Sequence, residues 1–371
     1  MNSKAAPGSS LAPRSADAPR FAALAAQDTA PFDWTRVSTH LAGEGMSLDL
    51  TVAPRRFAGG LANLNYLIWL DGAWAVLRRA PNGPLPRGAN DMVREHRVLS
   101  SLWRAFPLAP RSIHLCADPS VAGTPFQILE YRDGAILRGA EVSPLPDTAT
   151  TGARLSAMMI DTLAAVHAAP LASVGLNDLG RPTGFVRRTA EGWIARAFAV
   201  MGESPPTSAR ELIRWLTEAP LPEAQHPTLL HNDFKLDNII LDPKTADAVG
   251  IVDWDMATQG DPLLDLSTLL SYWAEPGDPD AMQDLAQMPT ARPGFWTREA
   301  AAVAYARQTG RSLDAFRAHR VLAIFRLGVV FHQLHARYKS EGSSDPRHGT
   351  FARIADGIFD FGVDVAAGKR F

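Results

Sequence analysis

The chain has 371 residues, of which 46% are hydrophobic and 20% charged, as is ordinary for a globular protein with room for two cores. Its net charge of −2 gives no reason to expect nucleic acid or an anionic membrane as a partner. The single cysteine, Cys116, excludes an internal disulfide framework, and no apolar run approaches the roughly 18 residues of a membrane span. We therefore expect a cytoplasmic protein, whose oligomeric state the sequence leaves open.

The chain begins with a segment rich in Ala, Pro, Ser and Arg that has little apolar patterning, and we predict a disordered tail over residues 1–30. A targeting peptide is the alternative, because Arg14 and Arg20 occur among few acidic residues, but the apolar core of a secretory signal is missing. The apolar spacing then predicts a short helix over Phe32–Leu41.

Residues 48–131 have the pattern of a small lobe rich in strands, with one helix over Asp91–Trp103. The predicted strands are Leu48–Val52, a strand ending at Leu70, Ala73–Arg78, Ser112–Leu115 and Pro125–Glu130. The pair Gly59 and Gly60 lies between two of these strands, where backbone amides without side chains can approach a phosphate closely. An ordinary hairpin turn is the alternative for this pair.

Most of residues 132–371 has helical periodicity. The helices expected in the last third lie near Leu266–Trp273, Glu299–Gln308, Asp314–Tyr338 and Phe351–Val363. The long helix carries His319, His332 and His335, which we interpret as helix-surface residues or candidates for a substrate pocket. No Cys/His cluster with zinc spacing occurs in the sequence.

The stretch Leu229–Leu266 interrupts this helical region. Two short apolar runs, Asn238–Leu241 and Val249–Val252, predict buried strands joined by the turn Asp242–Lys244. If they pair as a hairpin, Asn238 and Asp253 can supply two of the oxygen ligands that Mg²⁺ prefers in phosphate sites. Asp233 is then left as a carboxylate that can accept a proton from a substrate hydroxyl.

The same stretch resembles a known family. Its segment His231–Asn238 has the H-x-D-x-K-x-x-N spacing of a kinase catalytic loop, and Ile251–Asp255 stands where a metal-binding D-F-G segment follows. The residues within these two motifs resemble those of the aminoglycoside phosphotransferase-like small-molecule kinases (the APH/choline kinase family) more than those of protein kinases. It resembles in particular the kinase-like domain fused to acyl-CoA dehydrogenases and its free-standing bacterial relatives.

The resemblance covers roughly residues 30 to 365 and implies a two-lobed, protein-kinase-like α+β fold. A small β-rich N-lobe would span residues 31–131 and a larger helical C-lobe residues 132–371, with ATP and Mg²⁺ in the cleft. The reaction implied is transfer of the γ-phosphoryl group to a hydroxyl of a small-molecule acceptor. Asp233 would be the base, Asn238 and Asp253 the magnesium ligands, and Lys235 would neutralise charge on the phosphoryl group, a surface lysine being the alternative.

For the nucleotide, the resemblance implies that Arg78, oriented by Glu95, holds the phosphates together with Gly59, Gly60 and Asn63. Backbone groups at Glu130 and Tyr131 would hydrogen-bond the adenine. Two residues depart from the usual pattern: Ala62 replaces a serine, and Arg78 takes the place of a lysine. Arginine is always charged and grips phosphate with two hydrogen bonds, so we do not interpret the change as inactivating. Arg79 is the rival cation, and two solvated arginines are a further alternative.

The acceptor is less well defined. The helical region from Leu266 to Arg326 contains acidic residues but also seven arginines, which argues against a polycationic aminoglycoside and favours a sugar, a hydroxy acid or an acyl-CoA-type metabolite. A choline-like acceptor needs an aromatic cage, for which Trp273, Trp296 and Tyr305 are candidates. A catalytically weak, pseudokinase-like binding protein is the main alternative. A protein kinase is disfavoured because no A-P-E segment follows Asp253.

Overall fold

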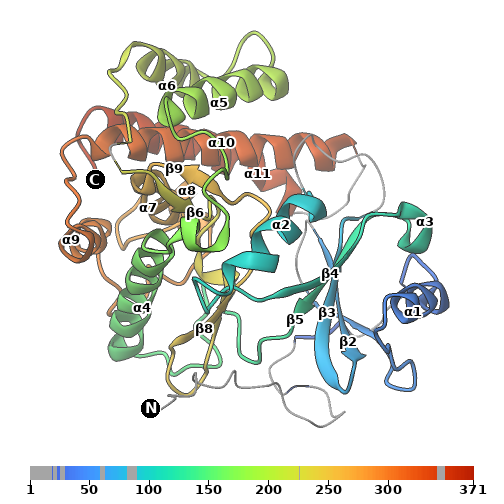
Figure 1. The fold of residues 1–371 in the computed structure, drawn as a ribbon. Helices are drawn as coiled ribbons and strands as arrows, with labels where there is room; N and C mark the ends of the chain where they lie inside the picture. Colours follow the sequence, from blue (N-terminus) through green and yellow to red (C-terminus); the bar gives the residue numbers. More distant parts are fainter. Residues whose placement is uncertain are drawn as a thin grey trace. The chain divides into compact units, whose positions relative to one another are not determined.

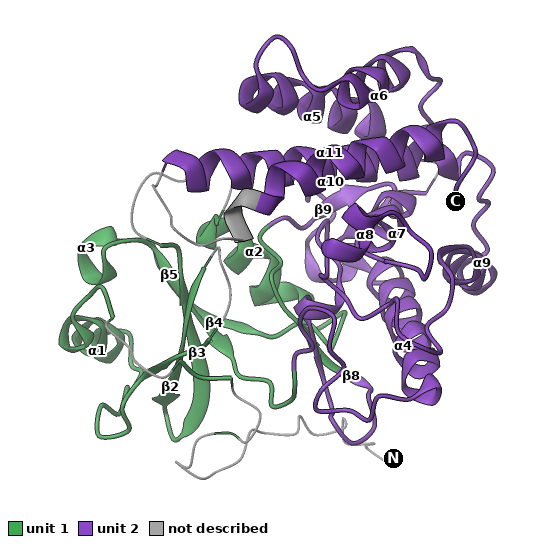
Figure 2. Ribbon diagram, turned by 180° about the vertical axis from the view of Figure 1, so that it is seen from behind, with its two compact units in different colours: residues 1–135, 249–255 green, residues 136–248, 256–371 purple. Residues whose placement is uncertain are grey.

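The computed structural model describes residues 19, 23–25, 30–58, 63–81, 90–224, 226–340 and 347–371. The chain divides into two compact units (Figure 2), one of residues 1–135 and 249–255 and the other of residues 136–248 and 256–371. Most of the predicted tail over residues 1–30 lies outside the described residues. No helix within the described ranges is long and apolar enough to cross a membrane.

The first unit is built on a five-stranded antiparallel sheet in the order β1-β2-β3-β5-β4. The strands are β1 Arg55–Arg56, β2 Leu64–Leu70, β3 Ala73–Arg79, β4 Ser112–Cys116 and β5 Phe126–Glu130. The β3 strand is central, with β2 hydrogen-bonded along one edge and β5 along the other, and five of its seven residues are buried. The sheet thus places the arginines at the end of β3 inside the unit.

Three helices accompany this sheet: α1 Trp34–Gly43, α2 Met92–Leu102 and α3 Pro119–Ala122 (Figure 1). Val37 and Leu41 of α1 are fully buried against the sheet residues Tyr66 and Phe126. The α2 helix begins where the Asp91 side chain accepts a hydrogen bond from the Arg94 amide, an N-cap that satisfies one of the free amides of the first turn.

The second unit is mostly helical, with short strands. Its long helices are α4 Ala149–His167, α5 Phe185–Met201, α6 Thr207–Glu218, α7 Pro262–Ser271, α9 Arg298–Thr309, α10 Phe316–Ser340 and α11 Arg347–Ala366. Its shorter elements are η1 Leu171–Val174, β6 Thr228–Leu230, η2 Leu236–Asn238, β7 Ile239–Leu241, β9 Thr258–Gly260 and α8 Asp280–Asp284, while β8 Ala248–Ile251 runs from this unit into the first.

The core of the second unit lies around α10 and α11, which pack against each other, with α5 and α6 on one side (Figure 1). The α7 helix packs on α10 and is buried on every side, as its sequence PLLDLSTLLS predicts for a helix that is apolar all round. Its N-cap, Asp261, is followed by Pro262 at the first helical position, where the missing N–H costs nothing. A buried helix therefore follows directly after the motif stretch.

The predicted hairpin is present as the two-stranded sheet of β7 and β8, and the strand and helix predictions hold to within a few residues. Two predictions were wrong in detail. Leu48–Val52 forms only an isolated bridge from Leu48 to Leu70, because the Asp49 side chain accepts from the Thr51 amide at 2.9 Å and turns the chain. Asn238 ends the 3₁₀ turn η2 instead of starting a strand, since its amide donates to the Lys235 carbonyl at 3.0 Å.

The loop before α9 packs closely on α4 at Gly294, and Gly277 offers a comparison without such a contact. Gly294 has a φ of +86°, and a Cβ there would lie 2.0 Å from the carbonyl oxygen of Ala149, whereas Gly277 has a φ of +87° and nothing within 4 Å. We expect Gly277→Ala to cost about 1–2 kcal/mol for its left-handed backbone. Gly294→Ala should cost about 1–3 kcal/mol more, because the α4 backbone must move. Thermal and urea unfolding measure both, and equal losses would contradict the close packing.

Candidate active site

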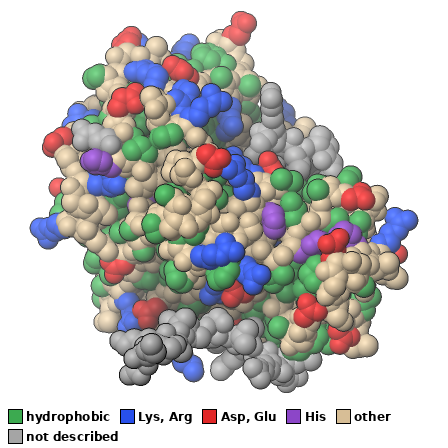
Figure 3. Space-filling view, in the orientation of Figure 1, with side chains coloured by type: hydrophobic (Ala, Val, Ile, Leu, Met, Phe, Trp, Pro, Cys, Tyr) green, Lys and Arg blue, Asp and Glu red, His purple; other side chains and the backbone are tan. Residues whose placement is uncertain are grey.

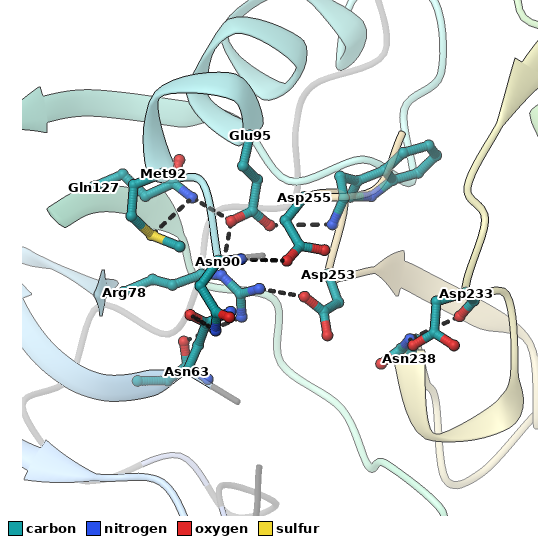
Figure 4. Close-up of polar contacts among 12 residues, drawn as sticks. Asn63, Arg78, Asn90, Met92, Glu95, Gln127, Asp233, Asn238, Asp253 and Asp255 are labelled. Carbon is teal, nitrogen blue, oxygen red and sulfur yellow. Dashed lines mark hydrogen bonds and ion pairs between the residues drawn. The ribbon is translucent and has the colours of Figure 1, made fainter. Parts of the chain in front are cut away.

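In the first unit, the buried side chain of Arg78 on β3 forms an ion pair with Glu95 on α2, with Nε and Oε2 2.8 Å apart (Figure 4). The Gln127 amide donates to the same carboxylate oxygen at 2.6 Å, and the Trp254 amide donates to the other at 3.1 Å. The predicted orientation of Arg78 by Glu95 is therefore present. Removing one partner of such a buried pair typically costs about 3–5 kcal/mol, because it leaves the other charge without compensation.

Arg78 also forms an ion pair with Asp253, and the amide of Asn90 donates to Asp255 at 3.2 Å. Burial alone would lower the pKa of the Arg78 guanidinium, but the charges of Glu95, Asp253 and Asp255 outweigh it and raise that pKa above its ordinary value. Burial, reinforced by the other two carboxylates, raises the pKa of Asp255 to about 7. Three carboxylates thus surround one guanidinium, a surplus of negative charge that suits a cation.

The Asp253–Asp255 segment is fixed by its neighbours. Asp253 has a φ of +70°, a conformation uncommon for residues other than glycine. The fully buried Trp254 donates from its indole nitrogen to the Ile251 carbonyl at 2.7 Å and packs edge-on against Phe106. Such a backbone conformation persists only where the surroundings determine it, and it directs the Asp253 carboxylate toward Arg78.

Arg79, the rival cation, faces the other way. Its Nε donates to the Thr124 hydroxyl at 2.9 Å, and its guanidinium lies over the Phe32 ring. Both arginines are buried, so the alternative of two solvated arginines is wrong. Because side chains alternate along β3, Arg78 points toward the carboxylates and Arg79 packs on the opposite face of the sheet.

Of the residues predicted to contact nucleotide, Gly59 and Gly60 lie outside the described residues. Asn63 is buried, accepts a hydrogen bond from Asn90 at 2.7 Å, and has an amide nitrogen without a partner among the described residues. Such a buried donor fits a phosphate oxygen. The Glu130 amide already donates to the Arg111 carbonyl at 2.8 Å, and the Tyr131 hydroxyl donates to Asp133 at 3.1 Å, so an adenine would have to use other groups of these residues.

In the second unit, Asp265 of α7 fixes the start of the loop between β6 and η2. One carboxylate oxygen accepts from the His231 amide at 2.6 Å, and the other accepts from the Asn232 amide at 2.7 Å. The buried His167 lies 3.4 Å from this carboxylate and 2.6 Å from the Tyr305 hydroxyl. Asp265 therefore braces the start of the loop, and His231 is itself fully buried.

Asn232, directly before Asp233, has a φ of +65° and is held on three sides. Besides its bond to Asp265, its side-chain amide donates to the Met256 carbonyl at 3.0 Å. The guanidinium of Arg326 on α10 donates to the Asn232 carbonyl at 2.5 Å and stacks over Trp193. These bonds offset the cost of the left-handed backbone and fix the direction in which the next residue leaves the loop.

Asp233 and Asn238 lie side by side (Figure 4), and Lys235 forms an ion pair with Asp233. The Lys235 ammonium is 3.2 Å from the Asp233 carboxylate and stacks over the Tyr272 ring. Burial would lower the pKa of Lys235, but the charge of Asp233 outweighs it and raises that pKa, so the lysine stays charged. The Asn238 amide nitrogen donates to the Asp233 carbonyl at 2.8 Å and to its carboxylate at 3.2 Å.

These contacts test whether a magnesium ion fits the donor set. Because the Asn238 nitrogen is committed to Asp233, its oxygen is left as the atom that can bind a hard cation. Asp253 adds a carboxylate within the surplus of negative charge around Arg78. Within the described residues no group of three or more His, Cys, Asp or Glu side chains is arranged as a complete metal site. Each unit therefore offers one oxygen donor of the kind that magnesium prefers, Asn238 in the second and Asp253 in the first.

The structure also places the aromatic residues, the histidines and the cysteine that the sequence analysis singled out. Trp273 and Tyr305 are fully buried, and the Tyr305 hydroxyl contacts His167, so these residues do not form an aromatic cage for a choline-like acceptor. His319 is buried against Asp261 at 2.8 Å, and His332 pairs with Asp356 at 3.1 Å, which makes both structural. Cys116 is buried, as expected, and burial raises the pKa of its thiol.

Sequence reasoning missed two residues that the structure brings to these clusters, Asn90 and Arg326. For Asp255 the sequence left open whether it reaches the metal or faces solvent, and the structure places it beside the Arg78 cluster, where it accepts from Asn90. Asn90 directly precedes the N-cap of α2, so its place before a capped helix was the available signal. The sequence contains no comparable signal for Arg326, because one arginine in a long helix looks like its neighbours unless the packing of α10 is known.

Comparison with known proteins agrees with this geometry. The sequence model of the phosphotransferase enzyme family matches residues 54–303. A solved structure of a Ralstonia eutropha protein assigned as an aminoglycoside phosphotransferase aligns with a TM-score of 0.73 at 21% identity, covering 91% of this chain and 99% of the other. A thermostable mutant of aminoglycoside phosphotransferase APH(4)-Ia, solved with ADP and hygromycin B, aligns at 0.58 and 16% identity over 90% and 99%. These likenesses confirm the predicted kinase-like α+β fold.

Curated relatives are longer proteins. Acyl-CoA dehydrogenase family member 11 of Gallus gallus is 29% identical over 85% of this chain and 41% of its own length. Acyl-CoA dehydrogenase family member 10 of Mus musculus is 27% identical over 85% of this chain and 29% of its own length. The chain thus spans less than half of these relatives, as the predicted resemblance to a fused kinase-like domain requires.

The buried His167 predicts a pH dependence of stability. Burial lowers the pKa of His167 below its usual 6.5, although the charge of Asp265 opposes this. The unfolded chain therefore takes up a proton at this residue as the pH falls below about 6.5, while the folded protein does not, and stability is lost. Urea unfolding at pH 7.5 and 5.5 should show a smaller loss in His167→Gln than in the wild type. The exposed His226→Gln is the control, and equal losses in both variants would contradict the assignment.

The Arg326 contact predicts a local effect on the loop. Arg326→Met keeps the side-chain volume over Trp193 but removes a charge-assisted bond worth about 1.5–3 kcal/mol. Hydrogen–deuterium exchange of the amides of His231 and Asn232 should therefore speed up about tenfold or more. Arg196→Met is the matched control, because exposed Arg196 also stacks on Trp193, at 4.6 Å. Unchanged exchange in Arg326→Met would show that Asp265 alone fixes the loop.

Proposed function

The chain belongs to the phosphotransferase enzyme family, and we propose that it transfers the γ-phosphoryl group of ATP to a hydroxyl group of a small-molecule acceptor. Members of this family are phosphotransferases that act on small-molecule hydroxyls. The observation that carries the proposal is the Asp233 carboxylate, which shares one loop with Lys235 and with an Asn238 whose oxygen is left over for a cation. A solved relative of the same fold contains ADP, which supports nucleotide binding here.

In the proposed mechanism Asp233 accepts the proton of the acceptor hydroxyl as its oxygen attacks the γ-phosphorus. Lys235, kept charged by Asp233, balances negative charge on the transferring group. Arg78, oriented by Glu95, holds phosphate oxygens, and Asn63 donates its unpartnered N–H to another. Asn238 and Asp253 would hold magnesium, which when bound neutralises phosphate charge. The catalytic effect then comes chiefly from positioning and electrostatics, and requires residues of both units to act on one nucleotide.

The charges of the second unit support an acceptor that is neutral or anionic. Glu275 and Asp278 both pair with Arg298, and Asp284 pairs with Arg353, so these carboxylates are already compensated and are not offered to a polycation. The groups near Asp233 include two cations, Lys235 and Arg326. A sugar, a hydroxy acid or an acyl-CoA-type metabolite therefore fits better than an aminoglycoside.

The second candidate is a catalytically weak protein that binds nucleotide or metabolite without efficient turnover. The ion pair between Arg78 and Asp253 favours it, because this carboxylate must exchange the arginine for a cation to act in catalysis. The loop of Asp233, Lys235 and Asn238 favours the enzyme, since a binding protein has no need of a positioned base.

Two isosteric substitutions separate binding from turnover. Calorimetry should show magnesium-dependent ATP binding that Asp253→Asn weakens at least tenfold, because one ligand charge is lost. Asp233→Asn should retain that binding but lower the rate of ADP release with an acceptor about 10²–10⁴-fold, the usual contribution of a general base. The exposed Asp280→Asn controls for loss of a carboxylate in the second unit.

The acceptors to be screened are hydroxy acids, hydroxyacyl-CoA esters, sugars and an aminoglycoside. Turnover that depends on Asp233 with any of them supports the enzyme, and the best acceptor identifies its class. MgATP binding without turnover dependent on Asp233 supports the binding protein instead. No binding at millimolar MgATP would overturn both.

A further inference from the structure

A cluster of histidines lies in the first unit, apart from the residues assigned above. His40 in the last turn of α1 and His114 on β4 approach each other with their Nε2 atoms 3.0 Å apart. Both rings pack against Phe126, with centroids 6.0 and 6.3 Å away. Neither side chain has a part in the proposed phosphoryl transfer.

The pair lies at an open hollow of about 440 Å³ that is also lined by Glu44, His96, Cys116 and Asp118. Glu44 follows His40 by four residues, and its amide donates to the His40 carbonyl, so the two side chains leave α1 one turn apart. His96 of α2 uses its Nδ1 atom on the Ser112 hydroxyl at 2.8 Å, which leaves Nε2 available. Histidine side chains reach the molecular surface (Figure 3), and His40, His96 and His114 are each only half-buried.

We propose that His40 and His114 form a binding site for a divalent transition-metal ion of the zinc, copper or nickel type. Imidazole nitrogen is a preferred ligand of these metals. Two nitrogens bound to one tetrahedral zinc at about 2.0–2.1 Å lie roughly 3.3 Å apart, so the observed pair needs to open by only a few tenths of an ångström. The two rings meet through these nitrogens with their centroids 5.2 Å apart, so to hold one ion both rings must turn slightly and take the tautomer with an unprotonated Nε2.

The remaining ligands come from the same hollow. Within the described residues no three side chains are already gathered around one point, so Glu44 or His96 completes the set by rotating, with water in the last position. Cys116 is not counted among the ligands, because its sulfur already contacts the Asp118 carbonyl at 3.6 Å.

The site links α1 to the edge strand β4 of the sheet. A bound metal would fasten the last turn of α1 to the strand, in addition to the apolar contacts of Val37 and Leu41. Because the ion binds only the folded arrangement of the two elements, it stabilises the unit by an amount that grows with the logarithm of the ratio of its free concentration to the dissociation constant. The effect needs neither nucleotide nor acceptor, so it is independent of the proposed function.

The test is zinc binding to the full chain, purified without a histidine tag and titrated in an excess of Mg²⁺ to occupy oxygen sites. Calorimetry should show one zinc ion per chain, and His40→Gln or His114→Gln should weaken binding at least tenfold. Glutamine retains a hydrogen-bonding side chain, so these variants keep the fold, which circular dichroism checks. His332→Gln, which changes a histidine of the second unit, is the control and should bind as the wild type does.

Two further measurements identify the ligands. The electron paramagnetic resonance spectrum of bound Cu²⁺ should show coupling to imidazole nitrogens that disappears in the His40→Gln, His114→Gln double variant. Glu44→Gln and His96→Gln decide between the two candidate third ligands, because only the true ligand weakens zinc binding when changed. Zinc should also raise the melting temperature of the wild type and leave that of the double variant unchanged.

Equal zinc affinity in the wild type and the double variant would overturn the proposal, as would the absence of any zinc binding that survives excess Mg²⁺. In either case the two histidines form an ordinary hydrogen bond, worth about 1 kcal/mol, between one protonated and one unprotonated nitrogen. Loss of MgATP binding would leave this result untouched, so failure of the metal site and failure of the proposed function are distinguished.

Discussion

A buried guanidinium must be compensated, and the first unit is arranged around that requirement at Arg78. Two carboxylates, Glu95 from α2 and Asp253 from the segment after β8, converge on it from parts of the sequence 17 and 175 residues away. Glu95 in turn accepts from the Trp254 amide, so the same carboxylate positions both the arginine and the segment that carries Asp253. Glu95, Asp253 and Asp255 thus share one guanidinium, and burial together with the other two carboxylates raises the pKa of Asp255 to about 7.

In the second unit, the polar groups that need hydrogen-bond partners belong to the backbone of one loop. The loop before Asp233 passes through a left-handed residue, Asn232, whose amide, carbonyl and side chain are all bonded. Asp265 and Arg326, which supply two of those bonds, come from the buried helices α7 and α10. A rigid helical core therefore fixes the geometry of a polar loop, which is the arrangement that catalysis by positioning needs.

The chain corresponds to less than half of the acyl-CoA dehydrogenase family members that it resembles, so their names describe proteins with additional sequence. The pairing of Glu275, Asp278 and Asp284 with arginines shows why a count of charges along the sequence says little about an acceptor pocket. The histidine pair of α1 and β4 illustrates the converse, since a separation of 74 residues hides it from any search for local metal-binding spacing.

Apolar periodicity predicted the hairpin of β7 and β8, which the structure contains, because such a pattern is local. The family and the kinase-like fold followed from the resemblance of the motif stretch to known kinases, and both are confirmed. The roles of Asp233, Asn238 and Asp253 rest on the same resemblance and stay predictions. The sequence also predicted the pair of Arg78 and Glu95, although only through the order of elements in related kinases. The contacts of Arg326, Asn90 and His40 were decided by the tertiary structure alone. Each joins residues that are distant in sequence, and a long-range partner leaves no periodic signal. The turn at Asp49 was missed for a different reason: a side chain bonded to its own backbone overrode an alternating pattern that otherwise favours a strand.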